Sequence, residues 1–170
     1  MGIMIKRKNT SSSFNTGFNL LELMVVVAIL GITALIAIPN MSRMVENSQL
    51  RSTVNDFSTA LSLARSEALT SGSGFVNPVN LGGGASFANG WCVSTAANCA
   101  PAIRVFPALT GQTVSGSTAS IQFNSRGELV GAAPTITFTP TGCAPGTADR
   151  ARVIQVEPSG RTSIDSGACV

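Results

Sequence analysis

Few side chains in this chain of 170 residues could perform acid–base or nucleophilic chemistry. It contains no His and no Tyr, so a Ser–His or Cys–His relay cannot form and general acid–base catalysis would depend on carboxylates. Asp149 and Glu157 could be proposed as such a pair. We interpret them instead as solvated charges paired with Arg150 and Arg152. This inventory of residues argues against an enzyme.

Glu22 is the most informative carboxylate, because it lies inside an apolar run that begins just after Gly17. The run extends to Pro39, and about 20 apolar residues in a helix are enough to cross a bilayer core. An unpaired charge in that environment is unfavourable by several kcal/mol. We therefore expect Glu22 to be a functional residue with a partner of opposite charge.

The flanks of the run predict its orientation and its processing. The polar leader carries its only charges at the basic residues 6–8, which would hold that end in the cytoplasm. The best cleavage point, between Gly17 and Phe18, precedes the apolar run, whereas a secretory signal is cut after it. Cleavage there would retain the membrane helix. It would also create an ammonium on Phe18, about one helical turn from Glu22.

The charge balance gives no sign of an acidic partner. Without residues 6–8, eight Arg stand against eight acidic residues, so no broad electrostatic steering of nucleic acid is expected. No Lys would remain in the mature chain, so a bound anion would have to be held by Arg or by backbone amides. After the leader and the apolar run, roughly 130 residues are left, enough for one domain with a modest core.

The four cysteines should face the periplasm, where disulfides persist. Neither their spacing nor the absence of His fits a zinc site, and we expect no metal and no cofactor. Four cysteines allow three pairings. We favour Cys92 with Cys99, which closes a short loop, and Cys143 with Cys169, which ties down the C-terminus.

Three other features have a plain structural interpretation. We expect Trp91 to pack in the core, because an isolated aromatic residue is a poor ligand surface. Glycines 82–84 lie in a segment, residues 80–89, that we predict to be a flexible loop rather than a phosphate cradle. Arg65 and Glu67 should lie on an ordinary exposed helix face, with subunit contacts as the alternative.

The periodicity beyond Pro39 remains helical. We predict one long helix over residues 18–70, with its first half in lipid and its second half packed on a sheet. Pro39 would kink or bend it, and residues 71–74 would end it. The expected buried stripe repeats at steps of three and four: Val54, Phe57, Leu61, Ala64 and Ala68. Polar residues fall largely on other faces: Arg43, Arg51, Asn55, Ser62 and Ser66.

The remainder of the chain is typical of strands. Four segments carry β-forming residues at strand length: residues 103–106, 120–123, 135–138 and 153–156. Residues 124–128 and 158–160 are predicted turns.

At its N-terminal end the chain resembles a type IV prepilin. The features in common are the basic leader, Gly17 before an aromatic residue, Glu22 five residues into the mature chain, and Pro39 at the end of the apolar run. Asn19 departs from the Thr that is commoner in that family, which leaves the charges unchanged. The resemblance implies cleavage after Gly17 by a prepilin peptidase and N-methylation of Phe18. It also implies a helical filament in which Glu22 meets the Phe18 ammonium of a neighbouring subunit.

A second resemblance covers the rest of the chain. Residues 57–68, the Asn-Gly-Trp of 89–91, residues 123–127 and Gly160-Arg161 are similar to the GspH/FimT family. This resemblance implies an α+β type IV pilin fold, a long N-terminal helix packed on an antiparallel β-sheet head. The implied segments are a cleaved leader (1–17), a transmembrane or filament-core helix (18–39), an amphipathic helix (40–70) and a β-rich periplasmic head (71–170).

The implied function is that of a minor pilin or pseudopilin. Such a structural subunit would join, and prime or cap, a type IV pilus or a type II secretion pseudopilus. Its expected partners are other major and minor pilins or pseudopilins, the prepilin peptidase and the inner-membrane assembly platform. It would start as a single-pass inner-membrane protein with a periplasmic head, and then enter the filament near its tip.

The alternative function is DNA binding during DNA uptake in natural transformation. DNA-binding members of the family resemble one another in a Gly-Arg-x-Arg element, and residues 160–163 lack its second arginine. Arg161, together with Arg150 and Arg152, could still contact phosphates. Glu157 and Asp165 dilute this patch, so we expect weak binding that salt screens easily.

Overall fold

The computed structural model describes residues 19–80, 85–116 and 120–170, without the side chains of residues 36–40, 80 and 85. The predicted cleavage site at Gly17 and Phe18, glycines 82–84 and the side chain of Pro39 lie outside the described residues. The chain forms two compact units, Met1–Met41 and Ser42–Val170. The helix α1 (Leu20–Ser71) contributes residues to both.

The first unit consists of the beginning of α1. Asn19 caps the helix, because its Oδ1 accepts a hydrogen bond from the backbone N–H of Leu21 at 3.3 Å and its carbonyl accepts one from Leu23 at 3.1 Å. The side chains described in this unit are all exposed. Among the described residues, no helix is both long enough and apolar enough to cross a membrane.

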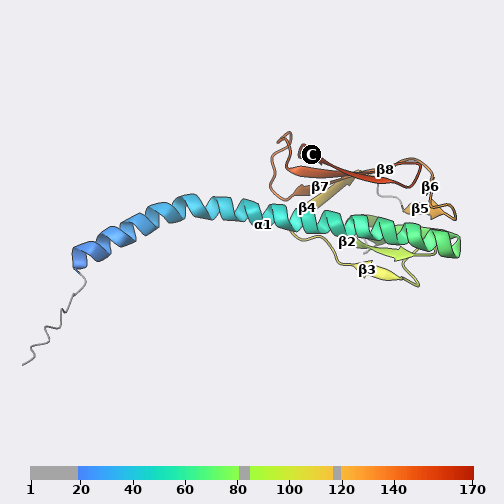
Figure 1. The fold of residues 1–170 in the computed structure, drawn as a ribbon, viewed down its shortest axis with the longest axis horizontal. Coiled ribbons are helices and arrows are strands. Elements are labelled where there is room, and N and C mark those ends of the chain that lie inside the picture. Colours follow the sequence, from blue (N-terminus) through green and yellow to red (C-terminus); the bar gives the residue numbers. More distant parts are fainter. Residues whose placement is uncertain (1–18, 81–84, 117–119) are drawn as a thin grey trace, which may run out of the picture. The chain divides into compact units, whose positions relative to one another are not determined.

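The second unit packs the later part of α1 against two antiparallel sheets (Figure 1). One sheet has the order β3-β2-β1-β5-β6 and the other β4-β7-β8-β9. The strands are β1 (Ser73–Asn80), β2 (Ala85–Ser94), β3 (Arg104–Phe106), β4 (Gln112–Gly116), β5 (Ile121–Asn124), β6 (Leu129–Val130), β7 (Thr135–Pro140), β8 (Ala151–Val156) and β9 (Thr162–Gly167). The predicted α+β class, with a helix on an antiparallel sheet head, is confirmed.

The core lies between the helix stripe and both sheets. The five residues predicted for that stripe are all buried, and Leu50 and Ala60 extend it. Phe57 is at the centre, with its ring 5.1 Å from those of Phe87 and Trp91 and 5.4 Å from that of Phe138, all in edge contacts. Trp91 is 2% exposed and packs as predicted. Edge contacts of this kind add to the free energy of burial because the ring quadrupoles attract one another.

The prediction of a loop over residues 80–89 is wrong at residue 80 and at residues 85–89, because β1 extends to Asn80 and pairs with β2, which begins at Ala85. Strands β1 and β2 are rich in Gly, Ala, Ser and Asn, which have low strand propensity, so pairing with neighbouring strands must specify them. The register of β1 shifts between Pro78 and Val79. Proline has no N–H to contribute to the ladder, and it is tolerated here because the pairing is irregular at this point.

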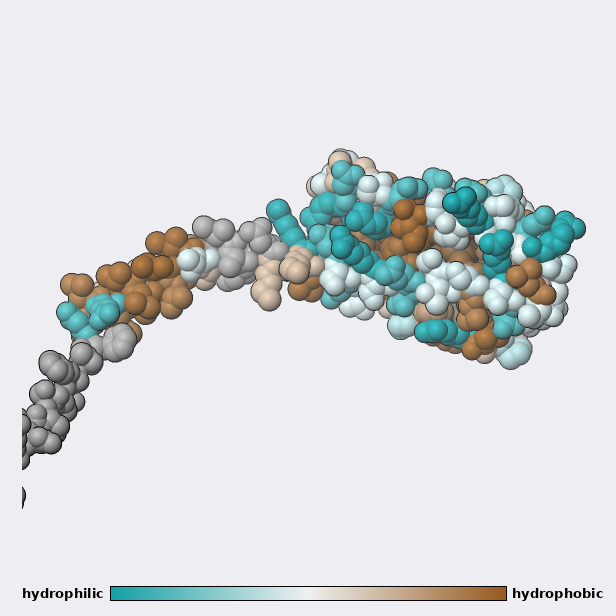
Figure 2. Space-filling model, in the orientation of Figure 1, coloured by the Kyte–Doolittle hydropathy of each residue, from teal (hydrophilic) through white to brown (hydrophobic). Residues whose placement is uncertain are grey.

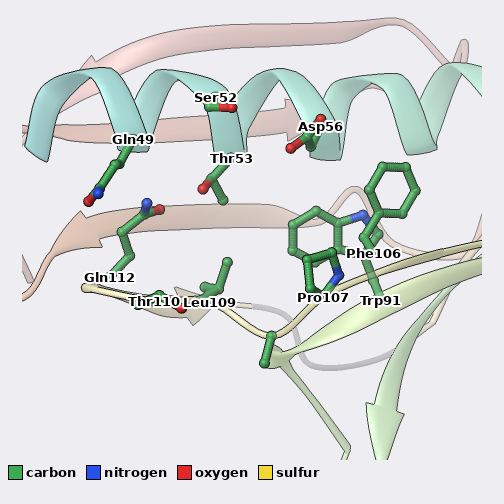
Figure 3. Close-up of a pocket in the computed structure, with 11 residues that line it drawn as sticks. Gln49, Ser52, Thr53, Asp56, Trp91, Phe106, Pro107, Leu109, Thr110 and Gln112 are labelled. Carbon is green, nitrogen blue, oxygen red and sulfur yellow. The ribbon is translucent and has the colours of Figure 1, made fainter. Parts of the chain in front are cut away.

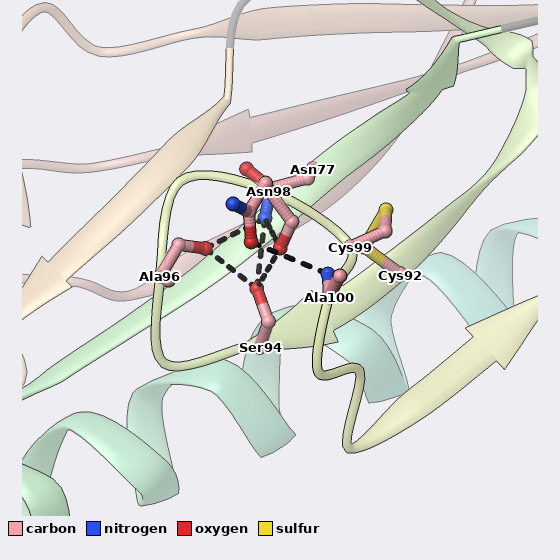
Figure 4. The surroundings of a disulfide bond; sticks show 7 residues. All are labelled: Asn77, Cys92, Ser94, Ala96, Asn98, Cys99 and Ala100. Carbon is pink, nitrogen blue, oxygen red and sulfur yellow. Dashed lines mark hydrogen bonds between the residues drawn. A yellow bond between two sulfur atoms is a disulfide. The ribbon is translucent and has the colours of Figure 1, made fainter.

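The cysteines are bonded in the two pairs favoured from the sequence, Cys92–Cys99 and Cys143–Cys169. A buried amide supports the first loop (Figure 4). The Nδ2 of Asn77 lies 2.9 Å from the hydroxyl of Ser94, and 3.0 and 3.1 Å from the carbonyl oxygens of Ala96 and Asn98. The amide therefore holds the loop on the sheet in addition to the disulfide.

Candidate functional site

Glu22 lies in the first turn of α1, where a carboxylate is favoured by the helix dipole. Its predicted partner, the N-terminus at Phe18, is outside the described residues. Among the described residues the carboxylate of Glu22 has no hydrogen-bond or ion-pair partner. The carboxylate is therefore available for a contact outside the part of this chain that the structure describes.

Apolar side chains surround Glu22 and cover the first unit. Leu20 is 73% exposed, Met24 66% and Leu35 76%. Figure 2 shows the hydrophobic colour over most of the described surface of this unit. An apolar surface of this extent on a soluble protein marks a site that contacts lipid or other subunits.

The surroundings of Arg65, on the head part of α1, differ from those predicted from the sequence. It was expected on an exposed face, but it is half-buried over two turns. A Cβ on Gly127 would lie 3.0 Å from its Nε, and a Cβ on Gly160 would lie 3.2 Å from the same atom. Its Nη2 donates a hydrogen bond to the carbonyl of Ser159 at 3.1 Å.

The two turns have the backbone geometry that allows the Arg65 side chain to lie across them. Gly127 and Gly160 have φ of 72° and 74°, in the left-handed region that favours glycine. Each turn is closed by a backbone bond of 2.8 Å, from Gly127 to the carbonyl of Asn124 and from Gly160 to that of Glu157. Three segments that carried the family resemblance therefore meet at one side chain, the Arg65 guanidinium.

A groove of about 420 Å³ runs beside Arg65, between α1 and the turn that joins β8 to β9. It is lined by Ser58, Leu61, Ser62, Arg65, Ser66 and Leu69 from the helix, and by Gly160, Arg161 and Thr162 from the turn. The groove thus combines two cationic side chains, hydroxyl groups and aliphatic carbon.

The turn over residues 124–128 carries a charged pair. Glu128 accepts hydrogen bonds from the Nε of Arg126 at 2.8 Å and from the Nδ2 of Asn124 at 3.0 Å. The bond from Arg126, followed by that from Asn124, holds the pKa of Glu128 below its usual range, and Glu128 in turn raises the pKa of Arg126. Both side chains are exposed to solvent, which limits the contribution of the pair to stability.

A smaller cavity, of about 240 Å³, lies between α1 and the segment after β3 (Figure 3). Trp91 and Phe106 form its apolar end, and Asp56 is its one acidic lining residue. The Nε1 of Trp91 and the Oε1 of Gln112 are buried without a hydrogen-bond partner among the described residues. Water molecules could satisfy them. Within the described ranges, no group of three or more metal-binding side chains lies close enough together to hold an ion.

The three arginines considered for DNA contact differ in their surroundings. Arg150 is bound to Glu46 on α1, with 2.7 Å between Nη2 and Oε2. Arg152 pairs with Ser166 in the β8–β9 ladder, whereas Arg161 comes just before β9, next to the Val156–Thr162 pair. Arg152 lies four residues from the Val156–Thr162 pair along β8, which is about 13 Å at 3.3 Å per residue. Arg152 and Arg161 therefore lie at different ends of the hairpin.

The acidic residues near these arginines have other partners than those predicted. Asp149 accepts a hydrogen bond from Ser166 at 3.1 Å, and Glu157 one from Ser159 at 3.4 Å. The predicted pairing of Asp149 and Glu157 with Arg150 and Arg152 is therefore wrong. The sequence could not reveal Glu46 as the partner of Arg150, because the two residues are 104 positions apart.

Solved structures with a similar fold include the type IV minor pilin FimU of Pseudomonas aeruginosa in two crystal forms. One is 19% identical, with a TM-score of 0.59 over 72% of this chain and 92% of FimU. The other is 20% identical, with a TM-score of 0.56 over 68% and 92%. The minor pseudopilin EpsH of Vibrio cholerae is 14% identical, with a TM-score of 0.49 over 69% of this chain and 97% of EpsH.

A comparison with curated proteins found no match. The sequence model of the family described as type II transport protein GspH matches residues 53–160. That segment begins within the head part of α1, ends at Gly160 and spans more than half of the chain. The chain therefore belongs to the GspH family of type II transport proteins, which confirms the resemblance of its head to the GspH/FimT family.

Proposed function

We propose that this protein is a minor pilin or pseudopilin, a structural subunit that joins a type IV pilus or a type II secretion pseudopilus and primes or caps it. The observation that carries the proposal is the exposed apolar surface at the start of α1 with Glu22 in its first turn. Membership of the GspH family and a fold similar to that of FimU support it.

The apolar surface provides the driving force for assembly. Burying one Leu, Val, Ile or Met side chain contributes about 1.5–3 kcal/mol, and many such side chains are exposed along this unit. A carboxylate transferred into the same environment is unfavourable unless it is paired. The Phe18 ammonium of a neighbouring subunit, created by cleavage after Gly17, would pair with Glu22 and set the register between helices.

Processing and localisation follow from the same chemistry. A prepilin peptidase would cut after Gly17, and Phe18 would be N-methylated. Residues 18–39 would anchor the protein in the inner membrane as a single span, with the head in the periplasm, before the assembly platform transfers it to the filament. Its partners would be other pilins or pseudopilins, and the protein would lie near the filament tip.

The test is incorporation into filaments in native cells that lack the chromosomal copy. Cells producing the wild-type protein should yield it in sheared pili or pseudopili, whereas Glu22→Ala should be cleaved but largely absent from the filament fraction. Asp165→Ala serves as the matched control, because it removes an exposed carboxylate from the head. Normal incorporation of Glu22→Ala, or absence of the wild-type protein from every filament fraction, would contradict the proposal.

DNA uptake is the weaker of the two candidate functions. Arg150 is neutralised by Glu46, and the remaining arginines of the predicted patch lie at different ends of the β8–β9 hairpin. No observation on the described residues favours a nucleic acid over a protein partner.

A further inference from the structure

We propose that the groove between α1 and the β8–β9 turn binds a carboxylate side chain of a neighbouring subunit, together with an aliphatic residue beside it. Arg65 and Arg161 would hold the carboxylate. The inference rests on the proposed function, because it takes the neighbour to be another pilin or pseudopilin. It adds a second contact, in the head, to the helix contact made through Glu22.

Arg65 is held in place before any partner arrives. Its side chain is half-buried over the backbone of Gly127 and Gly160, at distances that leave no room for a Cβ. The bond from Nη2 to the carbonyl of Ser159 fixes the rotation of the guanidinium. An arginine that is already ordered loses little side-chain entropy on binding, which is otherwise a major cost of a surface ion pair.

The charge of this arginine is not compensated. Among the described residues, ion pairs are formed by Arg126 with Glu128 and by Arg150 with Glu46, and none involves Arg65 or Arg161. A guanidinium presents five N–H groups in a planar fork that matches a carboxylate. Arg65 uses one of its groups internally, so most of the fork remains available at the groove.

The walls of the groove favour a peptide. Ser58, Ser62 and Ser66 are spaced by four residues on α1 and line one side. Their side chains are short, so a chain can approach closely. The hydroxyl of Ser62 donates to the carbonyl of Ser58 at 3.0 Å, and its oxygen remains able to accept a hydrogen bond. Leu69, which is 57% exposed, provides a surface for an aliphatic side chain.

A nucleic acid fits these features less well. Tight binding to a phosphate backbone requires several cations along its path, and the groove has two. Glu157 is in the same turn, with its backbone N–H bonded to the carbonyl of Arg161 at 2.8 Å. Its negative charge opposes any bound anion, but it opposes a run of several phosphates more than a single carboxylate. One carboxylate flanked by an aliphatic residue would use both arginines and Leu69.

The experiment titrates the full mature chain, in detergent micelles and labelled with ¹⁵N, with the peptide acetyl-Ala-Leu-Glu-Ala-amide. The Nε–H resonance of Arg65, assigned by its loss in Arg65→Gln, reports binding at the guanidinium itself. We expect a saturable shift of this resonance. The matched peptide with Gln in place of Glu should bind at least tenfold more weakly, because it cannot form the charged pair.

Three variants separate the groove from the rest of the chain. Arg65→Gln should weaken peptide binding at least tenfold. Arg161→Gln should weaken it severalfold, and this variant guards against misfolding because Arg161 is exposed. Arg51→Gln is the matched control, because Arg51 is an exposed arginine on the same helix outside the groove. It should bind the peptide as the wild type does.

The inference would be overturned by equal binding of the Glu and Gln peptides, by no shift at Arg65, or by equal losses in Arg51→Gln and Arg65→Gln. A duplex of 12 base pairs that binds more tightly than the Glu peptide and depends on Arg65 would assign the groove to nucleic acid instead. If the protein enters filaments but the groove binds no carboxylate, this inference alone fails. If the groove binds the peptide but the protein never enters filaments, both fail.

Discussion

Gly160 shows how one residue can determine the shape of a site. Its φ of 74° is unfavourable for a residue with a Cβ, and an added Cβ would collide with the carbonyl oxygen of Gly127. The same Cβ would press on the Nε of Arg65. Glycine at this position therefore allows the turn, the contact between the two turns and the placement of the arginine.

We predict that Gly160→Ala destabilises the head by about 2–4 kcal/mol, from left-handed strain and the displaced turn together. Gly142→Ala is the matched control. Gly142 also has a positive φ, of 80°, but nothing lies within 4 Å of its Cβ position, so only the strain of about 1–2 kcal/mol should appear. Denaturant unfolding of both variants measures the difference. Equal losses would contradict a close contact at Gly160.

A second prediction at the residue scale concerns processing. Gly17→Glu should leave an uncut precursor, because it replaces the small residue at the expected cleavage point. The wild-type mature chain should begin with N-methylated Phe18. Mass spectrometry of the N-terminal peptide distinguishes the two. A mature chain that begins at any other residue would rule out prepilin processing.

At the scale of elements, the two disulfides close loops of different length, with sequence separations of 7 and 26. A disulfide stabilises mainly by restricting the unfolded chain, typically by about 2–4 kcal/mol, and more for a longer loop. Replacing Cys143 and Cys169 by Ala should therefore cost about 1 kcal/mol more than replacing Cys92 and Cys99. Unfolding of the two double variants tests the order, and non-reducing peptide mapping tests the pairing. A peptide that joins Cys92 to Cys143 would refute it.

The turn over residues 124–128 should respond to acid. Because the pKa of Glu128 is lowered in the folded protein, its contribution to stability is present above the unfolded pKa and is lost as the pH falls through the lower folded pKa. Glu128→Gln should flatten the pH dependence of stability in this acidic range, because it removes at neutral pH the small contribution that the wild type loses in acid. Unfolding curves between neutral and acidic pH test this. An unchanged acid slope in Glu128→Gln would exclude Glu128 as the cause.

The elements that the sequence predicted well are those with a strong local pattern. The stripe from Val54 to Ala68 repeats at helical steps, and all its members are buried in the structure. Strands β3, β5, β7 and β8 coincide with clusters of β-forming residues. By contrast β1, β2, β4 and β9 consist largely of small and polar residues, whose conformation depends on the strands they pair with.

The residues of the candidate site differ in the same way, because only some of them are marked by a local sequence pattern. A carboxylate inside an apolar run is a local pattern that is visible in the sequence. Sequence alone could therefore propose Gly17, Phe18 and Glu22. The position of the Arg65 side chain depends on a contact with Ser159, which is 94 positions away in the chain. The sequence indicated turns at 124–128 and 158–160, but not that one helix side chain lies across both of them.

At the scale of the whole molecule, the distribution of charge decides between a protein partner and DNA. The eight arginines of the expected mature chain are balanced by eight acidic residues, and Arg150 is neutralised by Glu46. Affinity for duplex DNA increases with the number of phosphates neutralised together. Arg152 and Arg161 lie at different ends of the β8–β9 hairpin, and contacts between exposed arginines and phosphates are weakened by salt.

We therefore predict that the full-length protein in detergent binds duplex DNA no more tightly than the 10⁻⁴–10⁻⁶ M range that is typical of non-specific contacts at physiological salt. Arg161→Ala and Arg51→Ala should reduce this binding equally and slightly, because both remove one exposed positive charge. A mobility-shift assay at physiological salt measures the affinity. Sub-micromolar binding that Arg161→Ala abolishes and Arg51→Ala leaves intact would make DNA uptake the preferred function. Only a specific binding site distinguishes two exposed arginines of equal charge.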